Sequence, residues 1–127
     1  MTVTREEVLM GRDAIAPLTV ELEMNLTKLL ACLNKFRAAY GKPLLVSSGY
    51  RPPQINNQVT GAAKKSNHMK CLACDFKDPD GELAKWCLLN LDVLKGCELW
   101  LEAPSKTPGW CHLQCVPPKS GNRVFEP

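Results

Sequence analysis

Apolar residues recur every three or four positions over residues 22–40: Leu22, Leu26, Leu29, Leu30, Leu33, Phe36 and Tyr40. This spacing places them on one face of a helix. Residues 41–43, Gly-Lys-Pro, are expected to end that helix. Near the N-terminus, Thr4 and Glu7 fit a capping box that opens a shorter helix, which Gly11 could close.

Four short segments with apolar or alternating residues are predicted to be strands: residues 44–48, 72–77, 97–102 and 110–116. A turn at residues 78–81 leads into a helix through residue 91. Residues 49–67 predict a long loop, and loops of this length are often functional. The tail after residue 116 is expected to be irregular. The order of elements predicts an α+β fold with a small, largely antiparallel sheet packed with helices.

Composition and charge narrow the class of protein. The chain has 127 residues, 45% hydrophobic and 23% charged, which suits one globular domain spanning residues 1–127. A net charge of +3 without a dense basic patch does not indicate nucleic-acid binding. No apolar run approaches the roughly 20 residues of a membrane span, and the N-terminus lacks the apolar region of a signal peptide. We expect a monomer made in the cytoplasm, with no nucleic-acid or membrane partner.

Seven cysteines are many for such a chain. An odd number without an export signal argues against a complete disulfide framework. Free buried thiols or metal ligands remain as explanations.

Two sets of side chains are candidates for holding a metal. The first is His68, Asp75 and His112, which include both histidines of the chain. Two imidazoles and one carboxylate would leave a fourth position open on Zn²⁺, as in catalytic sites. The odd spacing between His68 and Asp75 places His68 in the loop before the strand and Asp75 on the strand, because side chains alternate between faces.

Alternation also predicts which faces would line such a site. Around Asp75, Ala73 shares its face and leaves room for a metal, whereas Cys74 and Phe76 point to the core. On the last two strands the outward faces would carry two sets: Trp110, His112 and Gln114, and Glu98, Trp100 and Glu102.

The second candidate set is sulfur. Cys71 and Cys74 form a Cys-x-x-Cys pair, and with Cys111 and Cys115 they could build a closed structural zinc site. The second pair has three residues between its members and lies in an alternating apolar pattern, which disfavours this arrangement. A third alternative is that the histidines are structural and bind no metal.

The combination Ser66-x-His68-x6-Asp75, preceded by residues 48–52 (Ser-Gly-Tyr-Arg-Pro) and Asn56 and followed by Trp110-x-His112, resembles the zinc D-alanyl-D-alanine carboxypeptidase family. That family includes phage endolysin peptidases and shares its fold with the Hedgehog signalling domain. The resemblance covers about residues 20–125. The end of the chain looks most like small phage-encoded members.

The resemblance implies one Zn²⁺ on His68, Asp75 and His112 and hydrolysis of a peptide bond in bacterial cell-wall peptide. It leaves open whether the enzyme is a D-Ala-D-Ala carboxypeptidase or an L-Ala-D-Glu endopeptidase. Arg51 would stabilise the oxyanion or bind a substrate carboxylate. The remaining substrate-binding candidates are Ser66, Asn56, Tyr50 and Trp110. A phage lysis protein released through a holin would reach the cell wall without a signal peptide.

The chain departs from the family pattern at two positions. Cys71 stands where the motif has Gly, which puts the loop geometry in doubt because Cys is disfavoured at positive φ. Gly109 stands where several members carry the catalytic Glu. We therefore expect Glu102 to be the base, with Glu98 in reserve. The main rival hypothesis is a non-catalytic zinc-containing binding module of the same fold, and a purely structural zinc protein is the third.

Overall fold

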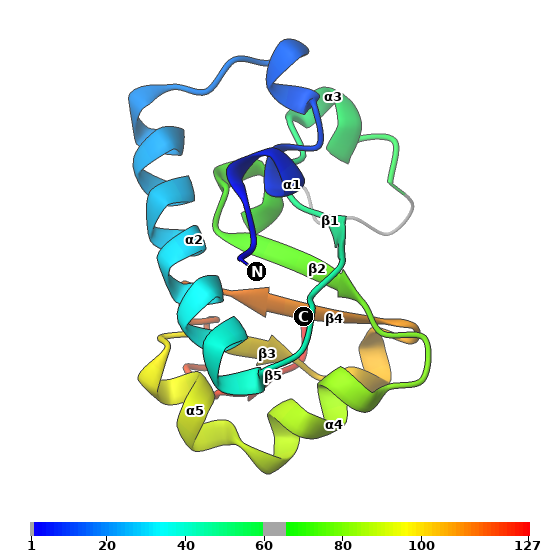
Figure 1. The fold of residues 1–127 in the computed structure, drawn as a ribbon. Helices are drawn as coiled ribbons and strands as arrows, with labels where there is room; N and C mark the ends of the chain where they lie inside the picture. The colour runs from blue at the N-terminus through cyan, green and yellow to red at the C-terminus, as the bar shows by residue number, and fades with distance from the viewer. Residues whose placement is uncertain (1, 60–65) are drawn as a thin grey trace.

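The computed structural model describes residues 2–59 and 66–127 (Figure 1). Its α-helices are α1 (Arg5–Leu9), α2 (Val20–Tyr40), α3 (Pro53–Asn56), α4 (Glu82–Leu89) and α5 (Leu91–Gly96). The 3-10 helices in the described ranges are η1 (Arg12–Ala14), η2 (Asn67–Lys70) and η3 (Pro104–Lys106), of which η3 follows α5. The strands are β1 (Val46–Ser48), β2 (Ala73–Lys77), β3 (Trp100–Glu102), β4 (Trp110–Gln114) and β5 (Val124–Phe125). The predicted α+β class is confirmed.

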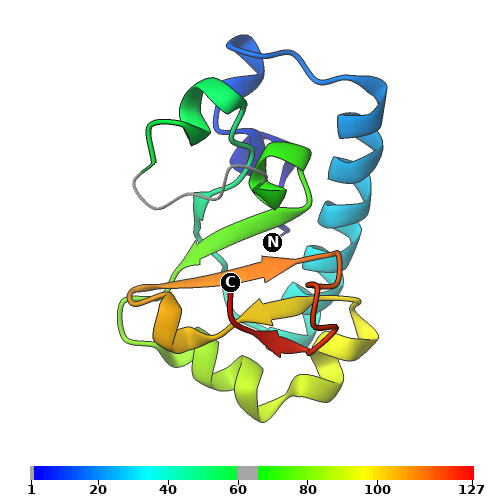
Figure 2. The same cartoon turned by 180° about the vertical axis from the view of Figure 1, so that it is seen from behind.

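The five strands form one sheet in the order β1-β2-β4-β3-β5. All neighbours are antiparallel except β3 and β5, which are parallel. Helix α2 runs along one side of the sheet, and α4 and α5 run along its lower edge (Figure 1). Seen from behind, the C-terminal segment that carries β5 completes the edge of the sheet next to β3 (Figure 2).

The core forms where the inward faces of the strands meet the helices. Cys74 and Phe76 of β2 are fully buried, as the alternation predicted. From β4, Cys111 and Leu113 point the same way and are also fully buried. Phe36 of α2 packs against this cluster, so the apolar face read from the helix periodicity is the face that the structure buries.

Several element ends follow their sequence signals. The Thr4 capping box is present, with the side chains of Thr4 and Glu7 each accepting from the other residue's backbone N–H. Helix α1 ends at Leu9, and its C-cap Met10 takes a left-handed conformation (φ 54°), one residue before the predicted Gly11. Helix α2 begins two residues earlier than the periodicity indicated, after the Thr19 cap, and ends at Gly41 as predicted (φ 77°).

The prediction of a strand over residues 97–102 is wrong at its start. Cys97 caps the end of α5, a helix that the sequence analysis did not separate from α4. Glu98 then takes a left-handed φ of 57°, and the strand begins only at Trp100. The tail is not entirely irregular either, since β5 pairs with β3.

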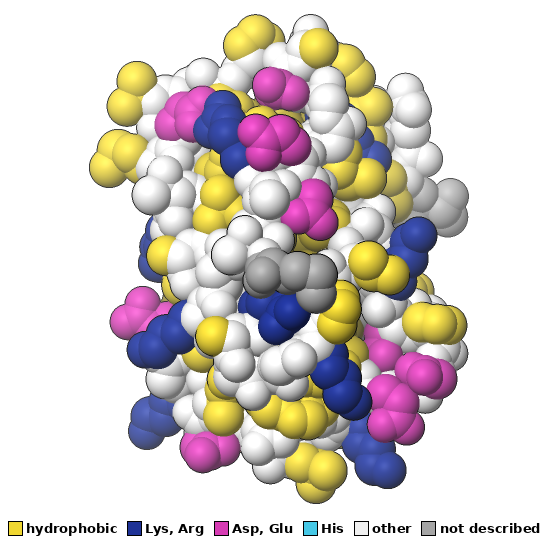
Figure 3. All heavy atoms as spheres, viewed as in Figure 1, with side chains coloured by type: hydrophobic (Ala, Val, Ile, Leu, Met, Phe, Trp, Pro, Cys, Tyr) yellow, Lys and Arg dark blue, Asp and Glu magenta, His cyan; other side chains and the backbone are white. Residues whose placement is uncertain are grey.

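The surface gives two further facts. On the face shown in Figure 3, lysine and arginine side chains are interspersed with acidic ones. Neither histidine is visible on that face, because His68 is 2% and His112 8% exposed. Among the described residues, no helix has the length and hydropathy needed to span a bilayer.

Candidate metal centre

A row of side chains crosses the sheet on the face opposite the core. Asp75 of β2 lies directly opposite His112 of β4. On β3, Trp100 is opposite Gln114 and Leu101 is opposite Leu113, so the same register sets Glu102 opposite His112. Glu102 in turn pairs with Phe125 of β5. Directly opposed residues point to the same face of a sheet, so three strands bring two acids alongside one histidine.

His68 reaches this row from outside the sheet. It lies in η2, whose first turn is capped by Ser66: the Ser66 hydroxyl accepts from the His68 backbone N–H at 3.2 Å. The His68 carbonyl accepts from the Arg51 backbone N–H at 3.1 Å, which ties η2 to the segment after β1. The expectation that His68 precedes the strand while Asp75 lies on it is therefore confirmed.

The three predicted ligands come together. Asp75 Oδ2 is 3.3 Å from His68 Nε2, and Asp75 Oδ1 is 2.8 Å from His112 Nδ1. One ligand atom from each residue lies within 4.8 Å of the other two. Within residues 2–59 and 66–127, this is the one group of three or more such side chains close enough to hold an ion.

Hydrogen bonding on the far side of each ring leaves the other ring nitrogen directed at Asp75, where a metal ion could bind. His68 Nδ1 lies 2.9 Å from the Gly49 carbonyl, which can only accept. A neutral imidazole has one N–H. If that N–H serves Gly49, Nε2 meets the Asp75 carboxylate either with a second proton, as an imidazolium that donates to it, or with a metal ion between the two groups. His112 has the same arrangement, with Nε2 2.9 Å from Gln114 Oε1 and Nδ1 facing Asp75.

The pKa directions of Asp75, His68 and His112 are compatible with a cation bound among these three side chains. Burial raises the pKa of Asp75, but hydrogen bonds from His112 and His68 outweigh it, so its pKa lies well below the usual range. Burial lowers the pKa of His68 more than Asp75 raises it, so this imidazole favours the neutral form that a metal requires. For His112 burial also lowers the pKa, but the bond and charge of Asp75 prevail and raise it.

Glu102 and Arg51 flank the ligands. Glu102 is half-buried, and burial is the main cause of its raised pKa, opposed by His112 and assisted by Asp75. Burial lowers the pKa of Arg51, while Asp75 acts in the opposite direction. A terminal nitrogen of Arg51 donates to the Ser66 hydroxyl at 3.3 Å, and its Nε is buried without a hydrogen-bond partner among the described residues.

Two expectations for site residues need correction. Tyr50 is 2% exposed, and its hydroxyl donates to the Ala16 carbonyl at 3.1 Å, so it is a core residue rather than a substrate contact. The reserve base Glu98 is exposed and lies outside β3, in a left-handed conformation two residues before the strand begins, so the strand alternation that related it to Glu102 does not apply.

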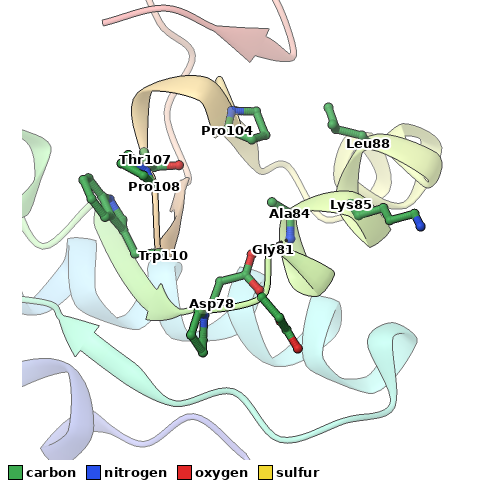
Figure 4. Close-up of a pocket in the computed structure, with 12 residues that line it drawn as sticks. Asp78, Gly81, Ala84, Lys85, Leu88, Pro104, Thr107, Pro108 and Trp110 are labelled. Carbon is green, nitrogen blue, oxygen red and sulfur yellow. Dashed lines mark hydrogen bonds between the residues drawn. The ribbon is translucent and has the colours of Figure 1, made fainter.

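The other two candidates have different surroundings. Asn56 is buried at the end of α3. Trp110 is half-buried and lines a surface pocket of about 410 Å³ between the start of α4 and the segment around η3 (Figure 4). None of the three metal-site side chains lines this pocket. The Asp78 carboxylate at its floor is already used to cap α4, accepting from the backbone N–H groups of Leu83 and Ala84 at 2.9 Å each.

The sulfur alternative does not fit. All seven cysteines are buried and free, and no cluster of them appears within metal-binding distance in the described parts of the chain. Burial raises the pKa of Cys71 to about 12 and that of Cys115 to about 11, so both side chains are thiols at neutral pH in the metal-free protein. Cys71 keeps the loop geometry that was in doubt: it takes the left-handed conformation (φ 57°) and ends η2.

Three contributors to the site were missed by the sequence analysis as functional residues: Gly49, Gln114 and Phe125. The Phe125 ring meets His112 edge-on, with centroids 6.2 Å apart. Gln114 was placed on the correct face, but its bond to His112 depends on a side-chain contact that alternation does not specify. Gly49 contacts His68 through its backbone carbonyl. Every residue has this group, so the residue type at position 49 does not predict the contact.

Comparison with known proteins identifies the family. A family model described as Peptidase M15 matches residues 1–94. Searches of curated proteins and of solved structures give no match. The matched region includes His68 and Asp75 and ends before Glu102 and His112, which the sheet register brings beside them. Because the match covers well over half of its length, the chain belongs to the Peptidase M15 family.

Proposed function

We propose that this chain is a zinc peptidase that hydrolyses peptide bonds in bacterial cell-wall peptide. Members of the Peptidase M15 family are zinc-dependent peptidases, and the chain has a His-Asp-His group suited to a metal. The observation that carries the proposal is the position of Glu102. It lies on the strand next to His112 and on the same face as Asp75, so a carboxylate without a ligand role adjoins the group that would bind zinc.

Zinc would be held by His68 through Nε2, by Asp75 through its carboxylate and by His112 through Nδ1. Three protein ligands of this composition are typical of catalytic zinc and leave one position for water or substrate. When bound, Zn²⁺ supplies Lewis acidity, which lowers the pKa of a water molecule and polarises a carbonyl.

Glu102 is the proposed general base. It accepts a proton from the water that attacks the scissile carbonyl and then donates a proton to the leaving amine. Its half-buried position raises its pKa, which suits a carboxylate that must both take and return a proton. The exposed Glu98 has no such position.

Arg51 is the proposed electrostatic partner of the substrate. Its guanidinium lies close enough to Asp75 for the two charges to interact, and one of its donors has no partner among the described residues. A buried donor without a partner is costly unless a ligand uses it. A substrate carboxylate or the developing oxyanion would accept from it. Ser66 holds this side chain and the backbone of His68 in one arrangement.

The substrate is proposed to be the stem peptide of peptidoglycan. Two bonds remain candidates: the terminal D-Ala-D-Ala bond and the L-Ala-D-Glu bond. A phage origin, with access to the cell wall after lysis begins, is the setting that the resemblance of the C-terminal segment favours. The protein would act as a monomer without nucleic-acid or membrane partners.

Purified muropeptides provide the test. Incubation with the zinc-loaded protein should release D-alanine if the enzyme is a carboxypeptidase, or a peptide beginning with D-glutamate if it is an endopeptidase. Mass spectrometry distinguishes these products. The Glu102→Gln variant should yield neither, and Glu98→Gln should behave as the unmodified protein. Binding of muropeptides without any cleavage would support the rival hypothesis of a non-catalytic module.

A further inference from the structure

We infer that Gln114 is a positioning residue that fixes the tautomer of His112 and so makes Nδ1, rather than Nε2, the nitrogen offered to the metal. The inference rests on the proposed zinc centre and adds a residue that the ligand motif does not contain.

The orientation of the Gln114 amide is set by two contacts. Its Nε2 donates to the Val116 carbonyl at 2.9 Å, and its Oε1 lies 2.9 Å from His112 Nε2. Because the Val116 carbonyl can only accept, the amide nitrogen must face it and the amide oxygen must face the ring. The side chain is 3% exposed, so neither contact is readily replaced by water.

An amide oxygen cannot donate, so His112 Nε2 must carry the hydrogen in this contact. In the neutral imidazole the lone pair is then on Nδ1, which is the nitrogen 2.8 Å from Asp75 Oδ1. Gln114 therefore selects the metal-binding nitrogen without approaching the metal position itself. Gln114 is two residues after His112 on the same face of β4, and its backbone pairs with Trp100 of β3 and Ala73 of β2.

His68 shows the same principle with the opposite nitrogen. Its Nδ1 lies on the Gly49 carbonyl, which leaves Nε2 toward Asp75. The two imidazoles thus offer different nitrogens to one ion, and each choice is made by an acceptor on the far side of the ring. Partners of this kind commonly change metal affinity about 10- to 100-fold when removed.

The experiment compares three variants of the full chain. Gln114→Leu removes the acceptor and introduces an apolar side chain of similar size. Gln114→Glu keeps an oxygen acceptor for Nε2–H, and in its protonated form it also keeps a donor for the Val116 carbonyl. Thr107→Val is the matched control, because Thr107 is also 3% exposed and its hydroxyl has no partner among the described residues, but it lies outside the metal cluster. Zinc affinity is measured by competition with a chelating indicator, and long-range ¹H–¹⁵N spectra of the zinc-loaded proteins identify the metal-bound and protonated nitrogens of His112.

Gln114→Leu should bind zinc about 10- to 100-fold more weakly and lose the single Nε2–H form of His112. Gln114→Glu should restore both properties, and Thr107→Val should leave both unchanged. Coordination of His112 through Nε2 in the unmodified protein, or a Gln114→Leu variant with unchanged zinc affinity and an unchanged tautomer, would overturn the inference. A Gln114→Glu variant that restores neither the zinc affinity nor the Nε2–H form of His112 would also overturn the inference. Failure of the unmodified protein to bind zinc would instead refute the proposed centre, and zinc binding without peptide cleavage would refute only the proposed reaction.

Discussion

Asp75 and His112 lie directly opposite each other on adjacent antiparallel strands, with Oδ1 of the acid 2.8 Å from Nδ1 of the imidazole. They are far apart in sequence, and only the register of β2 against β4 brings them together. A shift of one residue in that register would turn one of the two side chains into the core. The metal centre therefore depends on the same pairing that buries Cys74, Phe76, Cys111 and Leu113.

Replacing the proposed base should separate chemistry from metal binding. Glu102→Gln is expected to lower kcat by about 10²- to 10⁴-fold, the usual contribution of a general base, because the amide cannot accept the proton from water. Zinc content and the unfolding transition should stay unchanged, since Glu102 is not a proposed ligand. Cleavage of muropeptides at the original rate by this variant would exclude the role. Glu98→Gln is the control, because Glu98 is an exposed acid outside the strand.

Loss of one ligand should abolish stable metal binding. His112→Ala leaves two protein ligands, His68 and Asp75, and the variant is expected to be purified without zinc and without activity. Elemental analysis after dialysis gives the metal content, and circular dichroism shows whether the fold is retained. A folded His112→Ala protein with a full equivalent of zinc would indicate that another set of side chains holds the ion.

Zinc binding should release protons near neutral pH. Burial lowers the pKa of His112, but the bond and charge of Asp75 outweigh it and raise this pKa, which favours the imidazolium, with its second proton, in the zinc-free protein. The metal must displace it, so zinc affinity should fall as the pH is lowered through this range. Calorimetric titrations at pH 6.5 in buffers of different ionisation enthalpy measure the protons released. An enthalpy of binding that is independent of the buffer would contradict this assignment.

The zinc-free protein should lose stability in acid through Asp75. The depressed pKa of Asp75 means that its stabilising contribution is present above its unfolded value of about 3.8 and is lost as the pH falls toward the lower folded value. Urea unfolding at a series of pH values should show this loss, and Asp75→Asn should have a flatter dependence between about pH 4 and 2. Identical slopes for the two proteins would show that Asp75 is not linked to folding in this way.

Gly49 should tolerate no side chain. A Cβ at this position would lie 2.1 Å from the Val8 carbonyl oxygen, which belongs to the backbone. Gly49→Ala is therefore expected to destabilise the fold by about 2 kcal/mol or more and to weaken zinc binding, because the Gly49 carbonyl orients His68. Gly96→Ala is the control, since a Cβ there meets nothing within 4 Å. Equal unfolding free energies for the two variants would contradict the packing argument.

The sequence predicted His68, Asp75 and His112 because ligand type, odd spacing and strand alternation agreed on one arrangement. The same alternation placed Glu102 correctly and Glu98 wrongly. The difference lies in Cys97 and Glu98, which complete the turn after α5 with a left-handed residue before the strand begins. Hydrogen bonds of the helix end set the backbone there, from Glu98 N–H to the Lys95 carbonyl and from Leu99 N–H to the Leu94 carbonyl, and the alternating pattern of residues 97–102 did not reveal this helix end.

The side-chain contacts of Tyr50 and Gln114 could not be predicted from the spacing of residues along the sequence. Tyr50 adjoins the motif in sequence, yet its hydroxyl is directed to the Ala16 carbonyl and its ring is in the core. Gln114 was expected only to line the same face as His112, whereas its amide bonds the ring directly. Both contacts depend on the side-chain conformations and on the tertiary fold, which the alternation of residues does not specify. The Hedgehog-like fold remains a prediction, supported by the confirmed α+β class.

The most direct measurement of whether His68, Asp75 and His112 hold zinc is X-ray diffraction from crystals of the zinc-loaded protein. Data are recorded on both sides of the zinc absorption edge. We expect one anomalous peak within bonding distance of Nε2 of His68, an oxygen of Asp75 and Nδ1 of His112, with a solvent molecule completing the coordination. A peak surrounded by cysteine sulfurs, or the absence of any peak among these three side chains, would contradict it.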